Sequence, residues 1–122
     1  MLRQITFNFN SGEFSCRCGC GYDSISNCLV HRLQVIRDII KTPIVIHSGY
    51  RCRKHNIAVK GHSASLHRTG YAADWSVDVE EPQKTHLHTM LREMLEEWSG
   101  GYHYYPEGDF FHTDIRGVRA RW

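Results

Sequence analysis

Residues 65–77 read SLHRTGYAADWSV, a polar turn that runs directly into an apolar segment. The residues that lead up to Gly70 are rich in Gly, Ser and His, which predicts a loop. Residues 71–77 are predicted to form a strand. The glycine and two alanines between His67 and Asp74 allow the backbone to approach closely, so that an imidazole nitrogen and a carboxylate oxygen can share a metal ion.

A helix is predicted on each side of this stretch. The first begins at Ser24 or Ser26 and runs to about Lys41, where Pro43 stops it, and the second begins at Pro82. Their apolar faces carry Leu29, Leu33, Ile36 and Ile40 in the first helix, and Leu87, Met90, Leu91, Met94, Leu95 and Trp98 in the second.

The remaining elements are short. They are strands at 44–46, 102–105 and 110–115, a helix at 52–59, a loop at 11–22, and either an edge strand or an extended arm at 4–9. Two main helices beside a small, mostly antiparallel sheet make an α+β fold. We expect residues 1–122 to form a single domain.

Composition excludes several classes of protein. With 41% hydrophobic and 23% charged residues, the chain of 122 residues is typical of a globular protein. Its net charge of +2 comes from scattered Lys and Arg, which argues against a nucleic-acid partner. No apolar run approaches the roughly 20 residues that span a bilayer. The first residues, MLRQITFNFN, lack the apolar region of a signal peptide, so we expect the chain to be made in the cytoplasm. We also expect a monomer.

His112 is predicted to lie on a strand next to that of Asp74. With His67 it completes a set of two histidines and one carboxylate, which suits zinc. Such a set leaves a fourth position for water, as in hydrolytic sites. The alternative is that Asp74 is buried and satisfied by backbone donors, and that His112 is a core histidine. Spacing alone leaves both interpretations open.

The cysteines lie at 16, 18, 20, 28 and 52. Their odd number and the lack of a signal peptide argue against a disulfide framework. Alternate residues of an extended Cys-x-Cys-x-Cys segment point to opposite faces, and structural zinc sites usually use a wider spacing. We therefore expect buried or redox-inert thiols, with one disulfide to Cys52 and a second metal site as the alternatives.

Three motifs occur in order along the chain. They are SGYRC-x-x-HN from residue 48, S-x-H-x₆-D from residue 65, and F-x-H-x-D-x-R from residue 110. With these motifs, residues 14–122 resemble the zinc D-Ala-D-Ala carboxypeptidases. More narrowly, they resemble the small peptidoglycan peptidases of bacteria and bacteriophages in the lysostaphin, D-Ala-D-Ala metallopeptidase and hedgehog structural group.

The resemblance implies that Zn²⁺ is held by His67, Asp74 and His112. It also places Arg51 against the substrate, where the permanent charge and bidentate fork of a guanidinium suit a carboxylate or a polarised carbonyl. A structural salt bridge is the alternative role for Arg51. The further substrate contacts implied by these motifs are Tyr50 and Ser65.

Two aspartates are candidates for the general base. Asp109 lies three positions before His112, where many relatives carry an acidic residue, although a turn also favours aspartate there. Asp114 shares a strand face with His112 and could lie beside the metal or orient that ligand. We favour Asp109 and keep Asp114 as its competitor.

The function implied by the resemblance is hydrolysis of peptide bonds in peptidoglycan stem peptides, as a carboxypeptidase or an endopeptidase. A bacteriophage lysis enzyme, which meets the cell wall after the membrane is breached, would need no signal peptide. One alternative is a non-catalytic zinc domain that binds cell wall or protein. Another is a nucleic-acid module built on the cysteines, which the low net charge disfavours.

Overall fold

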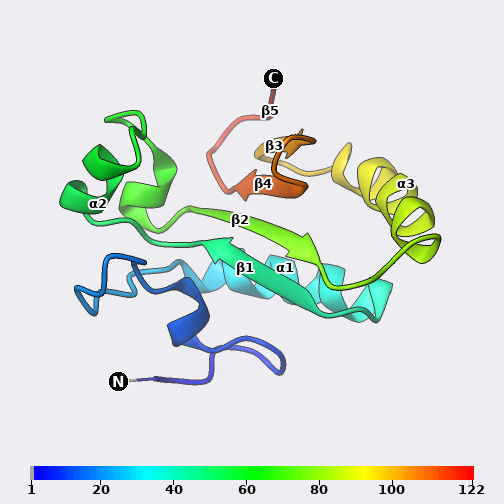
Figure 1. The fold of residues 1–122 in the computed structure, drawn as a ribbon, viewed down its shortest axis with the longest axis horizontal. Coiled ribbons are helices and arrows are strands. Elements are labelled where there is room, and N and C mark those ends of the chain that lie inside the picture. Colours follow the sequence, from blue (N-terminus) through cyan, green and yellow to red (C-terminus); the bar gives the residue numbers. More distant parts are fainter. Residues whose placement is uncertain (1) are drawn as a thin grey trace.

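Five strands form one sheet in the order β1-β2-β4-β3-β5 (Figure 1). The computed structural model describes residues 2–122. In chain order the elements are η1 (Ser11–Phe14), α1 (Asn27–Ile40), β1 (Ile44–Ser48), α2 (Arg53–Ala58), η2 (Leu66–Thr69), β2 (Ala72–Val77), α3 (Gln83–Leu95), β3 (Gly101–Tyr105), β4 (Phe110–Asp114) and β5 (Ala120–Arg121). Only the β3–β5 pairing is parallel among the named strands, so the predicted α+β fold with a mostly antiparallel sheet is confirmed.

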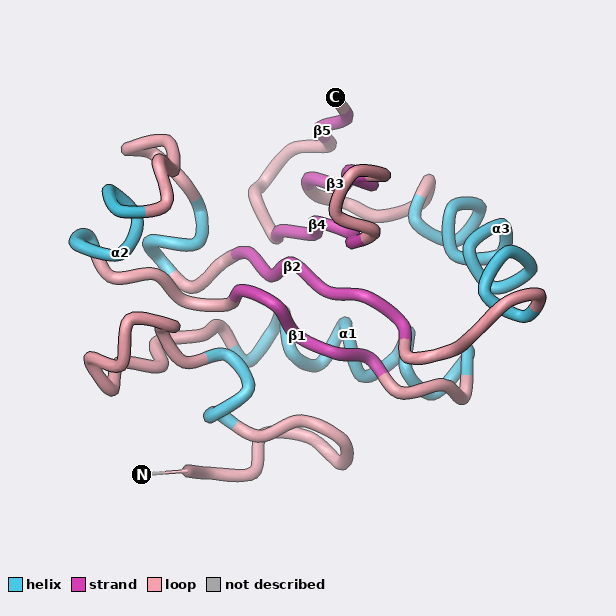
Figure 2. Tube along the Cα trace, in the orientation of Figure 1, coloured by secondary structure: helices cyan, strands magenta, loops and turns pink. Residues whose placement is uncertain are grey.

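One face of the sheet packs on the two long helices. Trp75 of β2 and Phe111 of β4 are fully buried there, with their rings stacked 4.9 Å apart. In Figures 1 and 2, α1 crosses behind the sheet and α3 lies beside its right-hand end. The leucines that these helices bury in the same core are Leu29 and Leu33 of α1, and Leu91 and Leu95 of α3. Because side chains alternate along a strand, the residues between the core positions face the other way.

The two long helices begin as their sequences predict. The Ser26 side chain accepts a hydrogen bond from the Leu29 backbone at the start of α1, and Pro82 immediately precedes α3. The second helix ends earlier than expected, at Leu95 rather than near Trp98. Trp98 nevertheless remains buried in the core, and its indole N–H is satisfied by donation to the Asp114 carbonyl at 2.7 Å.

The N-terminal segment differs from its prediction. Residues 4–9 form no named strand and are closed into a loop by a single bridge between Gln4 and Asn10. The segment expected to be a loop begins with the short helix η1. Its start is stabilised by a capping box, in which Asn10 accepts from the backbone of η1 and Glu13 accepts from the Asn10 backbone.

The cysteine-rich segment is not extended, so the expectation that its thiols point to opposite faces is wrong. Gly19 adopts a left-handed conformation, with φ of +83°, and reverses the chain within the Cys-x-Cys-x-Cys run. The expectation of buried thiols is also wrong in part. Cys16 is buried, Cys52 is half-buried, and the exposed thiols are those of Cys18, Cys20 and Cys28.

Arg17, in the same segment, covers the outer edge of the sheet. Its Nη2 donates to the carbonyl of Ile46 at 2.9 Å, and its Nε donates to that of His47 at 3.3 Å. Both carbonyls belong to β1, which lies at the edge of the sheet. Within residues 2–122, no helix combines the length and the apolar character needed to cross a membrane.

Two isoleucines of α1 give a matched test of this packing. Ile36 is 5% exposed in the core, whereas Ile39 is 54% exposed on the same helix. We expect Ile36→Ala to lower the free energy of unfolding by about 2–5 kcal/mol, because it leaves a cavity. Ile39→Ala should change it by no more than about 0.5 kcal/mol. Urea denaturation measures both, and equal losses would contradict the placement of α1.

Candidate metal centre

Asp74 and His112 lie directly opposite each other in the antiparallel pair of β2 and β4. They project from the face of the sheet that is turned away from the Trp75–Phe111 core. The His112 Nδ1 lies 2.8 Å from the Asp74 Oδ1. This pairing depends on backbone register, because a shift of one residue would send each side chain to the other face.

His67 reaches the same carboxylate from η2. Its Nε2 lies 3.3 Å from the Asp74 Oδ2, and its side chain is only 4% exposed. The helix η2 is capped by Ser65, whose hydroxyl accepts from the His67 backbone, and is ended by Gly70 with φ of +78°. The turn therefore aims the imidazole at β2, as the 65–77 segment predicts.

Hydrogen bonds decide which ring nitrogens are available to a metal. The His67 Nδ1 lies 2.8 Å from the Gly49 carbonyl, which can only accept, so this nitrogen carries the proton and Nε2 is left free. The His112 Nε2 lies 2.8 Å from the Asp114 Oδ2, and its Nδ1 faces the Asp74 carboxylate, so a metal ion held by Asp74 would replace the proton on Nδ1. The His67 Nε2 and the His112 Nδ1 are thus the two ring nitrogens that face Asp74.

The three side chains fit a metal ion. One donor atom from each of His67, Asp74 and His112 lies within 4.8 Å of the others. Two neutral imidazoles and a carboxylate form the donor set of many hydrolytic zinc sites. The Gly49 carbonyl and the Asp114 carboxylate are the kind of outer partners that hold zinc-binding histidines in place.

Electrostatics keep the central carboxylate charged. Burial alone raises the pKa of Asp74, but its contacts with the imidazoles of His112 and His67 hold it well below its usual range. Burial lowers the pKa of His112, whereas hydrogen bonds to Asp114 and Asp74 raise it overall. Without a metal, a proton shared among these groups satisfies the carboxylates, and a divalent cation would take over that role.

Asp114 is fully buried, and its carboxylate has several hydrogen-bond donors around it. Its carboxylate faces the His112 Nε2, and it accepts from the Gly101 backbone at 2.8 Å and from Arg116 Nη2 at 2.8 Å. A Cβ on Gly101 would lie 2.3 Å from the Asp114 Oδ2, so a side chain there would displace the carboxylate. The Gly100-Gly101 pair thus makes room for this acid.

Asp109 lies in a different environment. Its carboxylate accepts from Lys84 of α3 and, at 2.7 Å, from the Tyr104 hydroxyl, and the His88 ring is 3.9 Å away. The pKa of Asp109 is lowered, first by the hydrogen bond from Lys84 and then by that from Tyr104. Asp109 is not among the residues that line the cavity at the metal centre, whereas Asp114 is.

Arg51 approaches the centre from the segment between β1 and α2. Its Nη2 lies 3.6 Å from the Asp74 Oδ2, and its Nε donates to Ser48 at 3.2 Å. A further donation from Nη1 to Asn56, at 3.3 Å, fixes the plane of the guanidinium. Its side chain remains 17% exposed, and it lines the cavity. Arg51 is therefore held in place with part of its fork open to a ligand.

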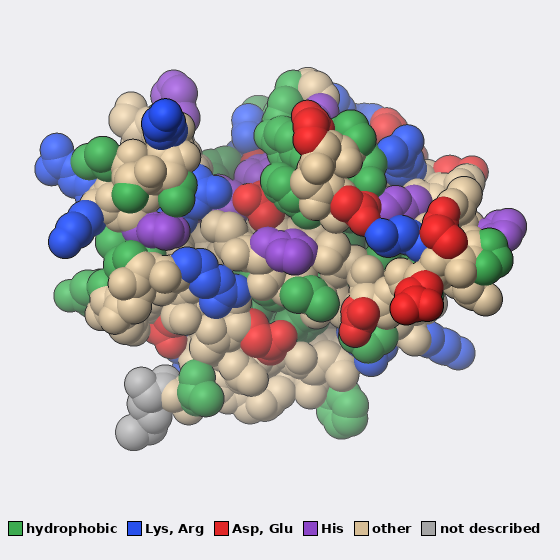
Figure 3. Space-filling view, in the orientation of Figure 1, with side chains coloured by type: hydrophobic (Ala, Val, Ile, Leu, Met, Phe, Trp, Pro, Cys, Tyr) green, Lys and Arg blue, Asp and Glu red, His purple; other side chains and the backbone are tan. Residues whose placement is uncertain are grey.

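A cavity of about 680 Å³ opens over the three side chains. It matches the hollow in Figure 3 between the part of the surface over α2 and the part over the β3–β4 turn. Of the other predicted substrate residues, Ser65 lines the cavity and Tyr50 is not among its lining residues.

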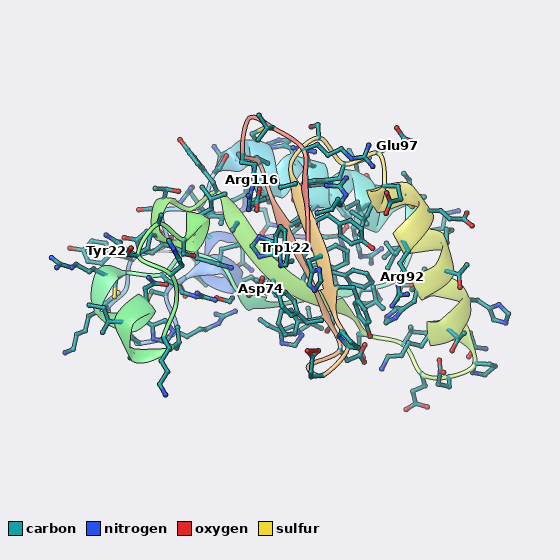
Figure 4. The ribbon with its side chains drawn as sticks, turned by 90° about the horizontal axis from the view of Figure 1, so that it is seen from above. Tyr22, Asp74, Arg92, Glu97, Arg116 and Trp122 are labelled. Atoms are coloured by element: carbon teal, nitrogen blue, oxygen red, sulfur yellow. The ribbon has the colours of Figure 1, made fainter. Side chains whose placement is uncertain are left out.

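Aromatic residues form part of the wall of the cavity. Phe110 and Trp122 line it together with Tyr105. The Trp122 ring stacks on His103 at 5.4 Å and meets the His112 ring edge-on at 5.3 Å. In Figure 4 this tryptophan lies over the strands, close to Asp74. The sequence feature that could have indicated Trp122 is its position directly after the charged RAR stretch.

The family model described as Peptidase M15 matches residues 7–114. This span includes His67, Asp74, His112 and Arg51, and it ends at Asp114. No curated protein matches the chain significantly in sequence.

The buried Asp114 gives a test of this network. Asp114→Asn removes the charge that faces His112 and Arg116, so we expect the metal-free protein to lose about 2–3 kcal/mol of unfolding free energy near neutral pH. The pKa of Asp114 is held low by hydrogen bonds from His112 and Arg116, against the effect of burial. Its contribution is therefore present above the unfolded pKa of about 4 and is lost as the pH falls further.

Denaturant titrations of the wild type and the variant, at neutral pH and at about pH 3, measure this difference. The exposed Asp78, which follows β2, provides the control, and Asp78→Asn should have little effect at either pH. A wild-type advantage that grows on acidification would contradict the low pKa of Asp114.

Proposed function

The chain belongs to the peptidase M15 family of D-Ala-D-Ala carboxypeptidase-like zinc peptidases, and on that premise we propose that it hydrolyses peptide bonds in peptidoglycan stem peptides. The observation that carries the proposal is the convergence of His67, Asp74 and His112 within 4.8 Å at an open cavity. We propose these three side chains as the zinc ligands. Three protein ligands with access to solvent favour a hydrolytic centre over a structural one, which is closed by four.

We assign the ligand atoms from the hydrogen bonds. His67 would bind through Nε2, because the Gly49 carbonyl holds its Nδ1, and His112 through Nδ1, because Asp114 holds its Nε2. A zinc ion at this position would supply a Lewis acid that polarises a scissile carbonyl and lowers the pKa of water toward about 7. The protein itself supplies orientation, charge and the cavity.

Arg51 is proposed to hold the substrate. Its guanidinium is fixed by Ser48 and Asn56 and lies next to the metal centre, so the cation is positioned before a ligand arrives. A carboxylate or a developing oxyanion would gain a charge-assisted hydrogen bond there, typically worth about 3–4 kcal/mol in a transition state. Ser65 is a second polar contact in the same cavity, and the wall at Phe110 and Trp122 offers apolar surface to a peptide.

The contacts support different roles for the two candidate bases. Asp114 is buried and accepts from several donors, so we propose that it orients His112. The Asp109 carboxylate is engaged by Lys84 and Tyr104 near α3, and we propose that it stabilises the β3–β4 turn.

The peptidase proposal is tested by digestion of purified peptidoglycan fragments. We expect zinc-loaded protein to cleave them, a chelator to stop cleavage, and added zinc to restore it. His67→Ala should abolish cleavage, whereas His86→Ala, at an exposed position of α3, should retain it. Mass spectrometry of the products then separates release of a terminal D-alanine from cleavage of an internal bond.

One outcome would overturn the peptidase and favour a binding domain. That outcome is an intact substrate with zinc-loaded wild type, together with zinc that is lost on His67→Ala. Binding of the same fragments without turnover would then indicate a non-catalytic cell-wall domain.

The role of Asp109 has its own test. We expect Asp109→Asn to lower the thermal midpoint through loss of the Lys84 contact, while kcat changes by less than about tenfold. Lys84→Met should reproduce the stability loss, because it removes the other partner of the same pair. A fall in kcat of more than about 100-fold with unchanged zinc content would instead identify Asp109 as the general base.

A further inference from the structure

Four thiols meet beside the N-terminal end of α2. Cys16, Cys18 and Cys20 come from the loop after η1, and Cys52 immediately precedes α2. All four sulfur atoms lie within 4.8 Å of one another. The loop and Cys52 are more than 30 residues apart in sequence, so tertiary structure brings this cluster together.

The sulfur separations suit a metal better than disulfides. The Sγ atoms of Cys16 and Cys18 are 3.5 Å apart, and those of Cys18 and Cys52 are 3.6 Å apart. A disulfide requires about 2.0 Å. Four thiolates placed tetrahedrally at about 2.3 Å from zinc are separated by about 3.8 Å.

The backbone is arranged around the thiols. Gly19 and Gly21 have φ of +83° and +87°, and these left-handed turns wrap the chain so that alternate cysteines face one point. The backbone N–H of Cys52 donates to the Cys16 Sγ at 3.4 Å, and that of His55 donates to the Cys52 Sγ at 3.4 Å. Donation to sulfur favours the thiolate form that binds metals.

The loop also has little else to stabilise it. From 16 to 22 it contains no helix or strand, and Cys16 is its one buried residue. Exposed thiols at Cys18 and Cys20 would be prone to oxidation if they were free. Lys54 lines the same cavity as these two thiols, so a cation lies close to a centre that would carry negative charge.

We propose that Cys16, Cys18, Cys20 and Cys52 form a structural zinc site, separate from the centre at His67, Asp74 and His112. Four protein ligands fill the tetrahedron, so this site has no position for substrate. Its effect is mechanical. It fastens the loop to Cys52, the residue next to Arg51, and thereby steadies the segment that positions the Arg51 guanidinium.

Zinc stoichiometry of the purified protein, measured by elemental analysis, tests the proposal. We expect two equivalents in the wild type and one in Cys18→Ser. Cys28→Ser is the matched control, because Cys28 is exposed on α1 outside the cluster, and it should retain two. His67→Ala should lose the other equivalent, and the double variant with Cys18→Ser should lose both. Zinc that follows His67 but not Cys18 would overturn this inference and leave the proposed function intact.

A second measurement does not depend on the folding of cysteine variants. His67→Ala loaded with Co²⁺ should show the intense thiolate-to-cobalt charge-transfer absorption of a tetrathiolate site. Its thiol reactivity should match the single thiol of Cys28 until a chelator is added. A cobalt spectrum without charge transfer, or disulfides found by mass spectrometry in freshly purified protein, would overturn the proposal.

Discussion

The candidate metal centre depends on the pairing of β2 with β4, which sets Asp74 opposite His112. On the other face of the same strands, Trp75 and Phe111 stack in the core. Burial of these two large rings stabilises the register, because a slip by one residue would expose both of them. The hydrophobic core thus fixes the positions of the polar side chains on the opposite face. The register alone brings the His112 imidazole and the Asp74 carboxylate together.

Around this pair, the polar groups form layers of increasing distance from the centre. Asp74 contacts both histidines, and each histidine is held by one further acceptor, the Gly49 carbonyl or the Asp114 carboxylate. Asp114 in turn is held by Arg116 and by the backbone of Gly101. A buried carboxylate without these donors would be costly, so the Gly101 position and the centre are coupled.

Much of this arrangement is readable from the sequence, and the exceptions have physical reasons. The α1 face, the Ser26 cap and the turn from His67 to Asp74 follow from local patterns, and local patterns were enough. The partners of Asp109 depend on how α3 docks against the β3–β4 turn, which no spacing along the chain reports. The convergence of the cysteines depends on the left-handed conformation of Gly19, which a strand-like alternation does not foresee. The capping box of η1 involves only a few residues, and the Gly-rich residues around it are typical of a loop, so the sequence did not predict this short helix.

The contact of Arg17 with β1 bears on how copies of the chain behave toward each other. An edge strand offers unpaired carbonyls, and another chain can add a strand to such an edge. Arg17 occupies the carbonyls of Ile46 and His47, so the cysteine-rich loop shields this edge from strand addition. An interaction that holds the cysteine-rich loop in place therefore also protects the molecule against aggregation through β1. This effect is independent of any chemistry in the cavity.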